Sequence, residues 1–347
     1  MLDRNIPRNE IETWLRETDP ARLSELWTVA DRVRRENVGD QVHLRGLIEL
    51  SNICVRSCLY CGIRAGNGTI TRYRMNEEEI IACARLAVEY GYGTVVMQAG
   101  EDYGIRREWL TAIIRRIKNE TPLAITLSLG ERPDEDLVEW REAGADRYLL
   151  RFETSDDALY EKIHPPLPNQ MRNRMDILRR LKELGYQTGS GVMIGIPGQT
   201  FATLARDVEI LREFDMDMVG VGPFLAHPET PLGRGEFQPE IDPADQAPSD
   251  ELTATKVVAL VRIVCPQAHI PSTTALATID AAHGRVHGLE RGANVIMPNL
   301  TPPKYRELYE IYPNKAAKHE TAEETNRKVH AQLAALGRRV GTGRGDR

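Results

Sequence analysis

Short apolar segments alternate with amphipathic helical segments from residue 41 to residue 312, and this alternation constrains the possible folds more than any other feature. Strands separated by helices of ten or more residues pair in parallel, and eight such units are the number that closes a barrel. We therefore predict an α/β fold, a complete (β/α)8 TIM barrel over residues 41–312. The expected strands are 43–50, 94–100, 124–130, 147–153, 188–195, 218–225, 269–275 and 293–299.

An open, doubly wound sheet is the alternative to a barrel. It would be favoured by Rossmann glycine spacing in the first strand-to-helix turn, which the sequence lacks. Residues 1–40 have apolar positions at helical spacing and predict an N-terminal helical extension, while residues 313–347 predict a C-terminal helix and a flexible basic tail. The Pro-rich, acidic insert 227–248 is expected to be a loop over the mouth of the barrel.

Composition narrows the function classes. The net charge of −6 and a pI near 5.9 leave no extended basic face, so we expect no nucleic-acid partner. No apolar run reaches the roughly 18 residues of a membrane span, and the charged N-terminus lacks the apolar core of a signal peptide. We therefore expect a cytoplasmic protein without a membrane partner, in which the cysteines stay reduced.

Three of the five cysteines form a Cys-x3-Cys-x2-Cys pattern, Cys54, Cys58 and Cys61, directly after the first expected strand. A structural zinc site is one interpretation, but it wants four ligands, and Cys83 and Cys265 lie in apolar segments that predict burial. Three thiolates and one open position suit a 4Fe-4S cluster, whose fourth iron can then bind a small molecule. The odd number of thiols thus points to reactivity rather than to a structural brace.

Polar side chains follow the expected strands at their carboxyl ends, as the cysteine pattern does. In a barrel these positions converge on one mouth, where active sites lie. Their convergence is the main evidence in the residues for an enzyme. The positions are Gln98, Glu101, Ser128, Glu131, Arg151, Glu153, Thr273, Thr274 and Asn299.

The cysteine pattern, with Tyr60 before its last cysteine and on the first loop of a barrel, resembles that of the radical S-adenosylmethionine (SAM) superfamily. The resemblance implies one 4Fe-4S cluster held by Cys54, Cys58 and Cys61, with the amino and carboxylate groups of SAM on the fourth iron. It also implies one-electron cleavage of SAM to a 5'-deoxyadenosyl radical. No cysteine follows Cys265, so a second cluster is not expected.

A closer resemblance covers nearly the whole chain. "MQAGED", "TLSLGE", "RFET", "IPSTTA" and "GANVIMPNLTPPKYRELYEIYP" are similar to stretches of the radical SAM maturases that help to build the iron centre of FeFe hydrogenase. The resemblance implies a small-molecule substrate, a cysteine-ligated iron complex that carries carbon monoxide and cyanide. It further implies an anaerobic reaction, an electron donor such as ferredoxin or flavodoxin, and other hydrogenase maturases as partners.

The same resemblance assigns residues to two groups. Those expected to bind the cofactor are Tyr60, Gln98, Ala99, Gly100, Glu101, Ser128, Glu153, Arg174 and Met193. Those expected to line the inner cavity as catalytic residues are Arg151, Thr273, Thr274 and Tyr305.

Each assignment has a plainer alternative. Gly100 alone would explain a tight turn at "MQAGED", Glu153 could form an ion pair at the barrel mouth, and Arg174 could be a solvated surface charge. The glycines of "TGSGVMIGIPG" fit either close approach of adenine or tight barrel packing. His227, beside a proline, is left out of the expected site because such a histidine is more often exposed.

Two other functions stay open. A radical SAM enzyme with another small substrate, similar to methylornithine synthase or biotin synthase, keeps the radical step, and Phe152 departs from the histidine of several relatives. A non-catalytic iron–sulfur electron carrier would instead need a fully ligated cluster and no large cavity.

Overall fold

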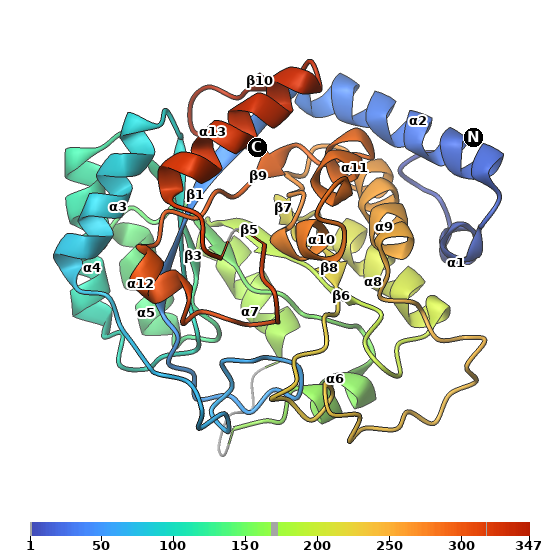
Figure 1. The fold of residues 1–347 in the computed structure, drawn as a ribbon, viewed down its shortest axis with the longest axis horizontal. Coiled ribbons are helices and arrows are strands. Elements are labelled where there is room, and N and C mark those ends of the chain that lie inside the picture. Colours follow the sequence, from blue (N-terminus) through green and yellow to red (C-terminus); the bar gives the residue numbers. More distant parts are fainter. Residues whose placement is uncertain (1, 168–172, 317) are drawn as a thin grey trace.

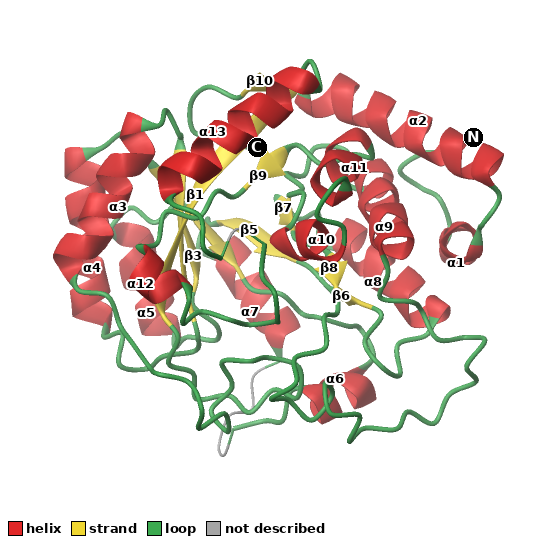
Figure 2. Ribbon diagram, in the orientation of Figure 1, coloured by secondary structure: helices red, strands yellow, loops and turns green. Residues whose placement is uncertain are grey.

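The computed structural model describes residues 2–167, 173–316 and 318–347 (Figure 1). Parallel strands form the interior, and helices cover the outside of the sheet (Figure 2). In the view of Figure 1, α2 (Pro20–Val38) and α13 (Ala322–Ala335) lie along the upper edge, with the C-terminus just beneath α13, and long loops gather at the lower edge around α6 (Asp157–Ile163). The described elements before the sheet are α1 Arg8–Arg16 and α2 Pro20–Val38.

The main sheet follows the predicted order of parallel neighbours, β1-β2-β3-β4-β5-β7, and β9 pairs with the other side of β1. The strands are β1 Gln41–Ser51, β2 Thr94–Ala99, β3 Ala124–Ser128, β4 Arg147–Leu149, β5 Gln187–Ser190, β7 Met218–Val219 and β9 Val295–Ile296. The helices between them are α3 Glu77–Glu89, α4 Arg107–Glu120, α5 Asp134–Glu142, α6 Asp157–Ile163, α7 Arg174–Glu183, α8 Phe201–Glu213, α9 Glu251–Val264, α10 Thr274–Ile279 and α11 Gly284–Glu290.

The (β/α) fold is confirmed, but the barrel is not fully closed by strand ladders as predicted. Between β7 and β9 the described residues pair only through isolated bridges, Met218 with His269 and Pro271 with Val295. Pro271 has no N–H to donate to a ladder. The expected strands 188–195 and 218–225 are also interrupted, and their second halves, β6 Met193–Ile194 and β8 Gly222–Pro223, form a separate pair.

Local sequence explains where the helices begin and which face they bury. Asn76 caps α3 and forms a reciprocal capping box with Glu79, as the spacing Asn-x-x-Glu favours. Every residue of α9 from Thr253 to Val264 is buried, because α8, α11 and the N-terminal helices α1 and α2 pack around it. The apolar stretch "VVALVRIV" therefore lies in the core, and none of the helices in the described residues combines the length and apolarity of a membrane span.

The C-terminal segment packs under the amino end of the sheet, although the sequence predicted a flexible tail there. After α13 Ala322–Ala335, β10 Arg339–Val340 pairs with the start of β1. The fully buried Arg147 donates to the Arg344 carbonyl at 2.8 Å and to the Asp346 carboxylate at 2.6 Å. A buried cation needs such partners, so the tail is held by an arginine nearly 200 residues away in sequence.

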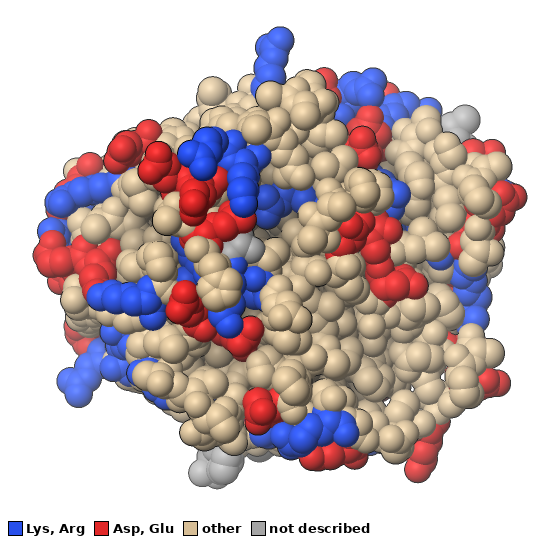
Figure 3. Space-filling view, viewed as in Figure 1, with Lys and Arg blue, Asp and Glu red and all other residues tan. Residues whose placement is uncertain are grey.

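On the face in Figure 3, positive and negative side chains are interspersed.

Candidate active site

The three clustered cysteines lie in the loop that follows β1, which we call the cysteine loop (residues 52–67). Its backbone is anchored to three other parts of the chain. Amides of the loop donate to the carbonyl oxygens of Glu101 at 3.0 Å, Ile163 at 2.8 Å and Ile311 at 2.9 Å. The loop is thus placed at the carboxyl end of the sheet by elements from both halves of the chain.

All three thiols are unpaired, and burial raises their pKa values above the usual range of cysteine. Burial brings the pKa of Cys58 to about 12. Against this, the backbone amides of Arg56 and Glu101 favour the thiolate of Cys54, and that of Ile63 favours the thiolate of Cys61. Bound iron would supply the positive charge that these buried thiolates otherwise lack.

The cysteine pattern leaves two kinds of metal site open, a single zinc ion and a 4Fe-4S cluster. A single zinc ion needs ligands that converge on one point, whereas a 4Fe-4S cluster puts each thiolate on a different iron. Within residues 2–167, 173–316 and 318–347, no three His, Cys, Asp or Glu side chains converge on a single-ion geometry. Three cysteine sulfurs, two of them with backbone amide donors, are the ligand type that iron–sulfur clusters use.

A cavity of about 350 Å³ opens beside the cysteine loop and runs into the barrel. It brings together most of the residues predicted from the sequence, from seven separate stretches of the chain. The predicted residues on its wall are Tyr60, Cys61, Gln98, Ala99, Ser128, Arg151, Glu153, Arg174, Met193, Thr273 and Thr274. The predicted residues that do not line it are Cys54, Cys58, Gly100, Glu101, Glu131, Asn299 and Tyr305.

Gly100 lies behind the wall, where the end of β2 meets the cysteine loop. A Cβ atom at this position would lie 2.3 Å from the Ile53 carbonyl oxygen and 2.9 Å from Cys54 Cβ. Only glycine permits so close an approach of the two backbones. Gly100 therefore sets the distance between "MQAGED" and the first cysteine, which is more than a plain turn requires.

Glu101 belongs to a buried network of charges behind the cavity. Arg56 Nε lies 2.8 Å from Glu101 Oε1, and Arg56 Nη2 lies 2.7 Å from Glu131 Oε2. Arg174 Nε reaches the other oxygen of Glu131 at 3.0 Å. Burial raises the pKa of Glu101, and the charge of Arg56 opposes this shift. The network joins the cysteine loop, the "SLGE" turn and α7 into one unit.

Arg174 is the member of that network that reaches the cavity. Its side chain is only 10% exposed, so it is not the solvated surface charge that the sequence alone left open. Besides Glu131, it donates to the Arg151 carbonyl at 2.5 Å and contacts His164 Nε2 at 2.7 Å. Burial and the Arg174 charge lower the pKa of His164 to about 2, so this ring is neutral beside the cation.

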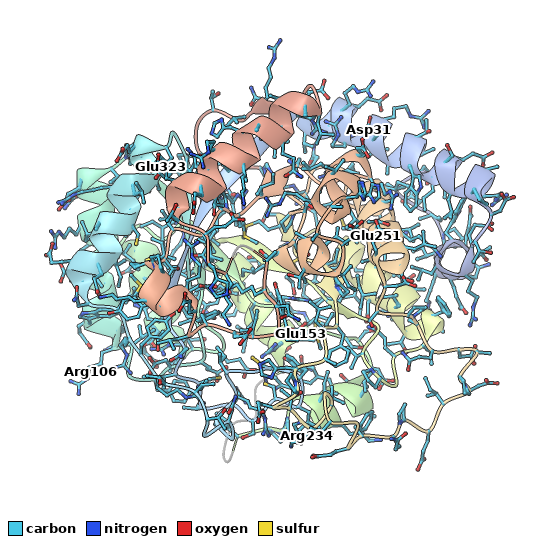
Figure 4. The ribbon with its side chains drawn as sticks, viewed as in Figure 1. Asp31, Arg106, Glu153, Arg234, Glu251 and Glu323 are labelled. Atoms are coloured by element: carbon cyan, nitrogen blue, oxygen red, sulfur yellow. The ribbon has the colours of Figure 1, made fainter. Side chains whose placement is uncertain are left out.

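Glu153 is held in a conformation that is rare for a residue with a side chain. Its φ is +66°, and its backbone is pinned by Gly191 O at 3.1 Å and Met193 N at 3.0 Å. Its carboxylate lies 3.2 Å from Arg151 Nη2. Strain of this kind persists where surrounding contacts enforce it, often at functional sites. In Figure 4 Glu153 lies inside the molecule, whereas Arg106 is at its edge.

Gly191 supports the packing explanation for one glycine of "TGSGVMIGIPG". A Cβ atom there would lie 1.8 Å from the Gly220 carbonyl oxygen. The neighbouring strands could not approach with any other residue at this position.

Tyr305 is not brought to the cavity. Its hydroxyl donates to Glu79 at 3.0 Å, and its ring stacks on Tyr73 with a centroid distance of 4.6 Å. Tyr312, seven positions later, lines the cavity, and burial raises its pKa. In this segment α12 spans only Pro303–Arg306, and Tyr312 lies beyond its end.

Glu49 and Lys315 also line the cavity and were not singled out from the sequence. They form a buried ion pair, and Glu49 accepts a further hydrogen bond from Asn299 Nδ2 at 2.9 Å. Glu49 lies inside an apolar strand, and Lys315 lies outside the expected barrel segment 41–312, so no local pattern marked either residue.

Asp207, on α8, is expected to make the stability of the fold depend on pH. It is fully buried and accepts from Ser155 N at 2.6 Å and Gln199 Nε2 at 3.0 Å, and burial raises its pKa to about 7. Because the folded pKa lies above the unfolded one, stability from this group is present below about pH 4 and is lost as the pH rises to about 7.

Asp207→Asn removes the ionisable carboxyl, so we expect this variant not to lose stability from this group as the pH rises to about 7. Relative to the unchanged chain, its free energy of unfolding should rise by about 2–3 kcal/mol between roughly pH 5 and pH 8. Urea unfolding of both proteins at the two pH values measures the difference. A difference that does not vary with pH would contradict the burial of an ionisable Asp207.

The chain is similar to known proteins both in sequence and in fold. The radical SAM superfamily profile matches residues 48–211. The chain is 46% identical over 322 residues to the [FeFe] hydrogenase maturase subunit HydE of Thermotoga maritima, covering 93% of this chain and 88% of that protein. It is 30% identical over 276 residues to the 3-methylornithine synthase of Methanosarcina acetivorans, covering 79% and 74%. The crystal structure of methylornithine synthase (PylB) superposes with a TM-score of 0.80 at 25% identity, covering 96% and 94%.

Proposed function

The chain belongs to the radical SAM superfamily, and from this premise we propose that it acts in maturation of the FeFe-hydrogenase iron centre. The observation that carries the proposal is the 46% identity to a HydE maturase across 93% of the chain. The cavity beside Cys61 supports it, because an electron carrier with a fully ligated cluster would need no enclosed space lined by polar groups.

Members of the superfamily use a 4Fe-4S cluster and SAM, which together supply one-electron cleavage of SAM to a 5'-deoxyadenosyl radical. We propose that Cys54, Cys58 and Cys61 hold a single cluster and leave its fourth iron open to SAM. Five free thiols suit a reducing compartment, so we further propose a cytoplasmic, anaerobic protein with ferredoxin or flavodoxin as electron donor.

The walls of the cavity supply groups for the parts of SAM. Arg174 is buried and pre-oriented by Glu131, and its guanidinium suits a carboxylate. Glu153 offers a carboxylate to amino or hydroxyl donors, and the Gln98–Gly100 backbone adds carbonyl acceptors beside the cysteine loop. Tyr60, Ser128 and Met193 complete this side of the wall.

The inner part of the cavity supplies groups for a substrate. Arg151, Thr273 and Thr274 lie on its wall together with Tyr312 and Lys315. Cations and hydroxyl donors favour an anionic or carboxylate-bearing molecule. We propose a cysteine-ligated iron complex with carbon monoxide and cyanide as that substrate, exchanged with the other hydrogenase maturases.

A related enzyme with another small substrate is the second candidate, favoured by the TM-score of 0.80 to methylornithine synthase. Expression in a strain that has an FeFe hydrogenase but lacks its HydE-type maturase separates the two. Restored hydrogen evolution, absent with a Cys54→Ala variant, supports maturation. No restoration, together with formation of 3-methylornithine or biotin by the reconstituted protein, would contradict it.

A further inference from the structure

One arginine outside the cysteine pattern ties both ends of the cysteine loop together. Arg72 Nη1 donates to the carbonyl oxygens of Asn52 at 2.6 Å and Ile63 at 2.7 Å. Arg72 Nη2 donates to those of Arg64 at 2.7 Å and Asn67 at 3.1 Å. Four carbonyl oxygens, one before the first cysteine and three after the last, thus meet on one guanidinium. The three thiols lie on the ring of chain that this contact closes.

The backbone around Arg72 is itself fixed. Arg74 forms an antiparallel bridge with Ser51, and Met75 N donates to Leu50 O at 2.8 Å, so this segment lies against the end of β1. The guanidinium therefore projects from a segment that is anchored to the end of β1, across a loop that has no helix or strand of its own. A long, planar side chain with forked donors is suited to such a span, and a lysine is not.

Arg72 also places a positive charge next to the cysteines. The carbonyl oxygens of Asn52 and Ile63, which Arg72 contacts, belong to residues two positions from Cys54 and Cys61. The charges of these two thiolates oppose the lowering of the Arg72 pKa by burial. Among the residues that the structure describes, no Asp or Glu side chain forms an ion pair with Arg72. Its charge is shared with carbonyl dipoles and is not cancelled by a carboxylate.

We propose that Arg72 is a positioning residue of the iron–sulfur site, which closes the cysteine loop and keeps a cation beside two of its three thiolates. This inference rests on the proposed function for its second part, since a cluster is needed for the charge to act on. Reduction adds one negative charge to the cluster, and a nearby cation stabilises the reduced form more than the oxidised form. Arg72 thereby raises the midpoint reduction potential of the cluster.

The loop part is tested by hydrogen–deuterium exchange on the full chain, with and without a reconstituted cluster. In both Arg72→Gln and Arg72→Lys, the amides of the cysteine loop should exchange about tenfold faster. A tenfold change corresponds to a loss of about 1.4 kcal/mol in the free energy of local opening. Amides of α3 and α4 should keep their wild-type rates, which shows that the fold is intact. The control is Arg85→Gln, on a side chain that is 59% exposed. Wild-type exchange in the loop of Arg72→Gln would overturn the proposal.

The charge part is tested by redox titration followed by electron paramagnetic resonance. The midpoint potential of Arg72→Gln should shift to a more negative value, and that of Arg72→Lys should stay closer to the wild type because the charge is kept. Equal potentials for the two variants would overturn this part. Failure of the wild type to take up a 4Fe-4S cluster would refute the proposed function and the charge part with it, while the exchange rates still decide the loop part.

Discussion

Replacing Cys58 with serine is expected to abolish 5'-deoxyadenosine formation. Cys58 is buried within the cysteine loop, and two remaining thiols leave two irons of the proposed cluster without protein ligands. Loss of groups that merely support metal ligands costs 10- to 100-fold, so loss of a ligand itself should lower activity by more than about 100-fold. The measurement is chromatography of the nucleoside product after anaerobic reduction with dithionite, together with the iron content of the protein.

Cys265→Ala is the matched control. Cys265 is also a buried cysteine, at the end of α9, but it lies outside the cysteine loop. This variant should keep its iron content and its product yield. Equal activity of Cys58→Ser and the unchanged protein would show that the reaction does not depend on the three-cysteine site.

Arg174→Lys is expected to weaken SAM binding by about 100-fold. The guanidinium contacts Glu131, His164 and the Arg151 carbonyl at once, which orients it at the cavity wall. A lysine ammonium keeps the charge but cannot make this planar set of contacts, and it cannot grip a carboxylate with two parallel bonds. Equilibrium dialysis of SAM against the cluster-loaded protein gives the dissociation constant.

Arg179→Lys provides the control on the same helix, because its side chain is 60% exposed and pairs only with Asp176 among the described ion pairs. Its dissociation constant should match that of the unchanged protein. Unaltered affinity in Arg174→Lys would mean that Arg174 serves the buried charge network alone and does not touch the cofactor.

The sequence predicted the parts of this protein whose signals are local and periodic. Buried parallel strands give short apolar runs, and the helices between them keep a 3.6-residue pattern, so the order of the elements could be read directly. Because the carboxyl ends of parallel strands meet at one edge, polar residues placed there, such as Ser128, Glu153 and Thr273, were expected to converge, and they do line one cavity.

Other parts depend on contacts between distant segments, which leave no periodic trace. Full barrel closure was predicted from the number of units, but two-residue strands and Pro271 reduce pairing to single bridges. Tyr305 was expected in the cavity from the family resemblance, but its hydroxyl bonds to Glu79 outside the cavity, and Tyr312 lines the wall instead. The ordered tail depends on Arg147, whose partner Asp346 could not be inferred from either stretch alone.

The central claim is that one iron of the cluster carries no protein ligand and binds SAM. Electron paramagnetic resonance of the reduced, reconstituted protein before and after addition of SAM tests it most directly. We expect a 4Fe-4S signal whose g-values change when SAM is added, with 5'-deoxyadenosine formed in the same sample. A spectrum that is indifferent to SAM, with no nucleoside product, would contradict it.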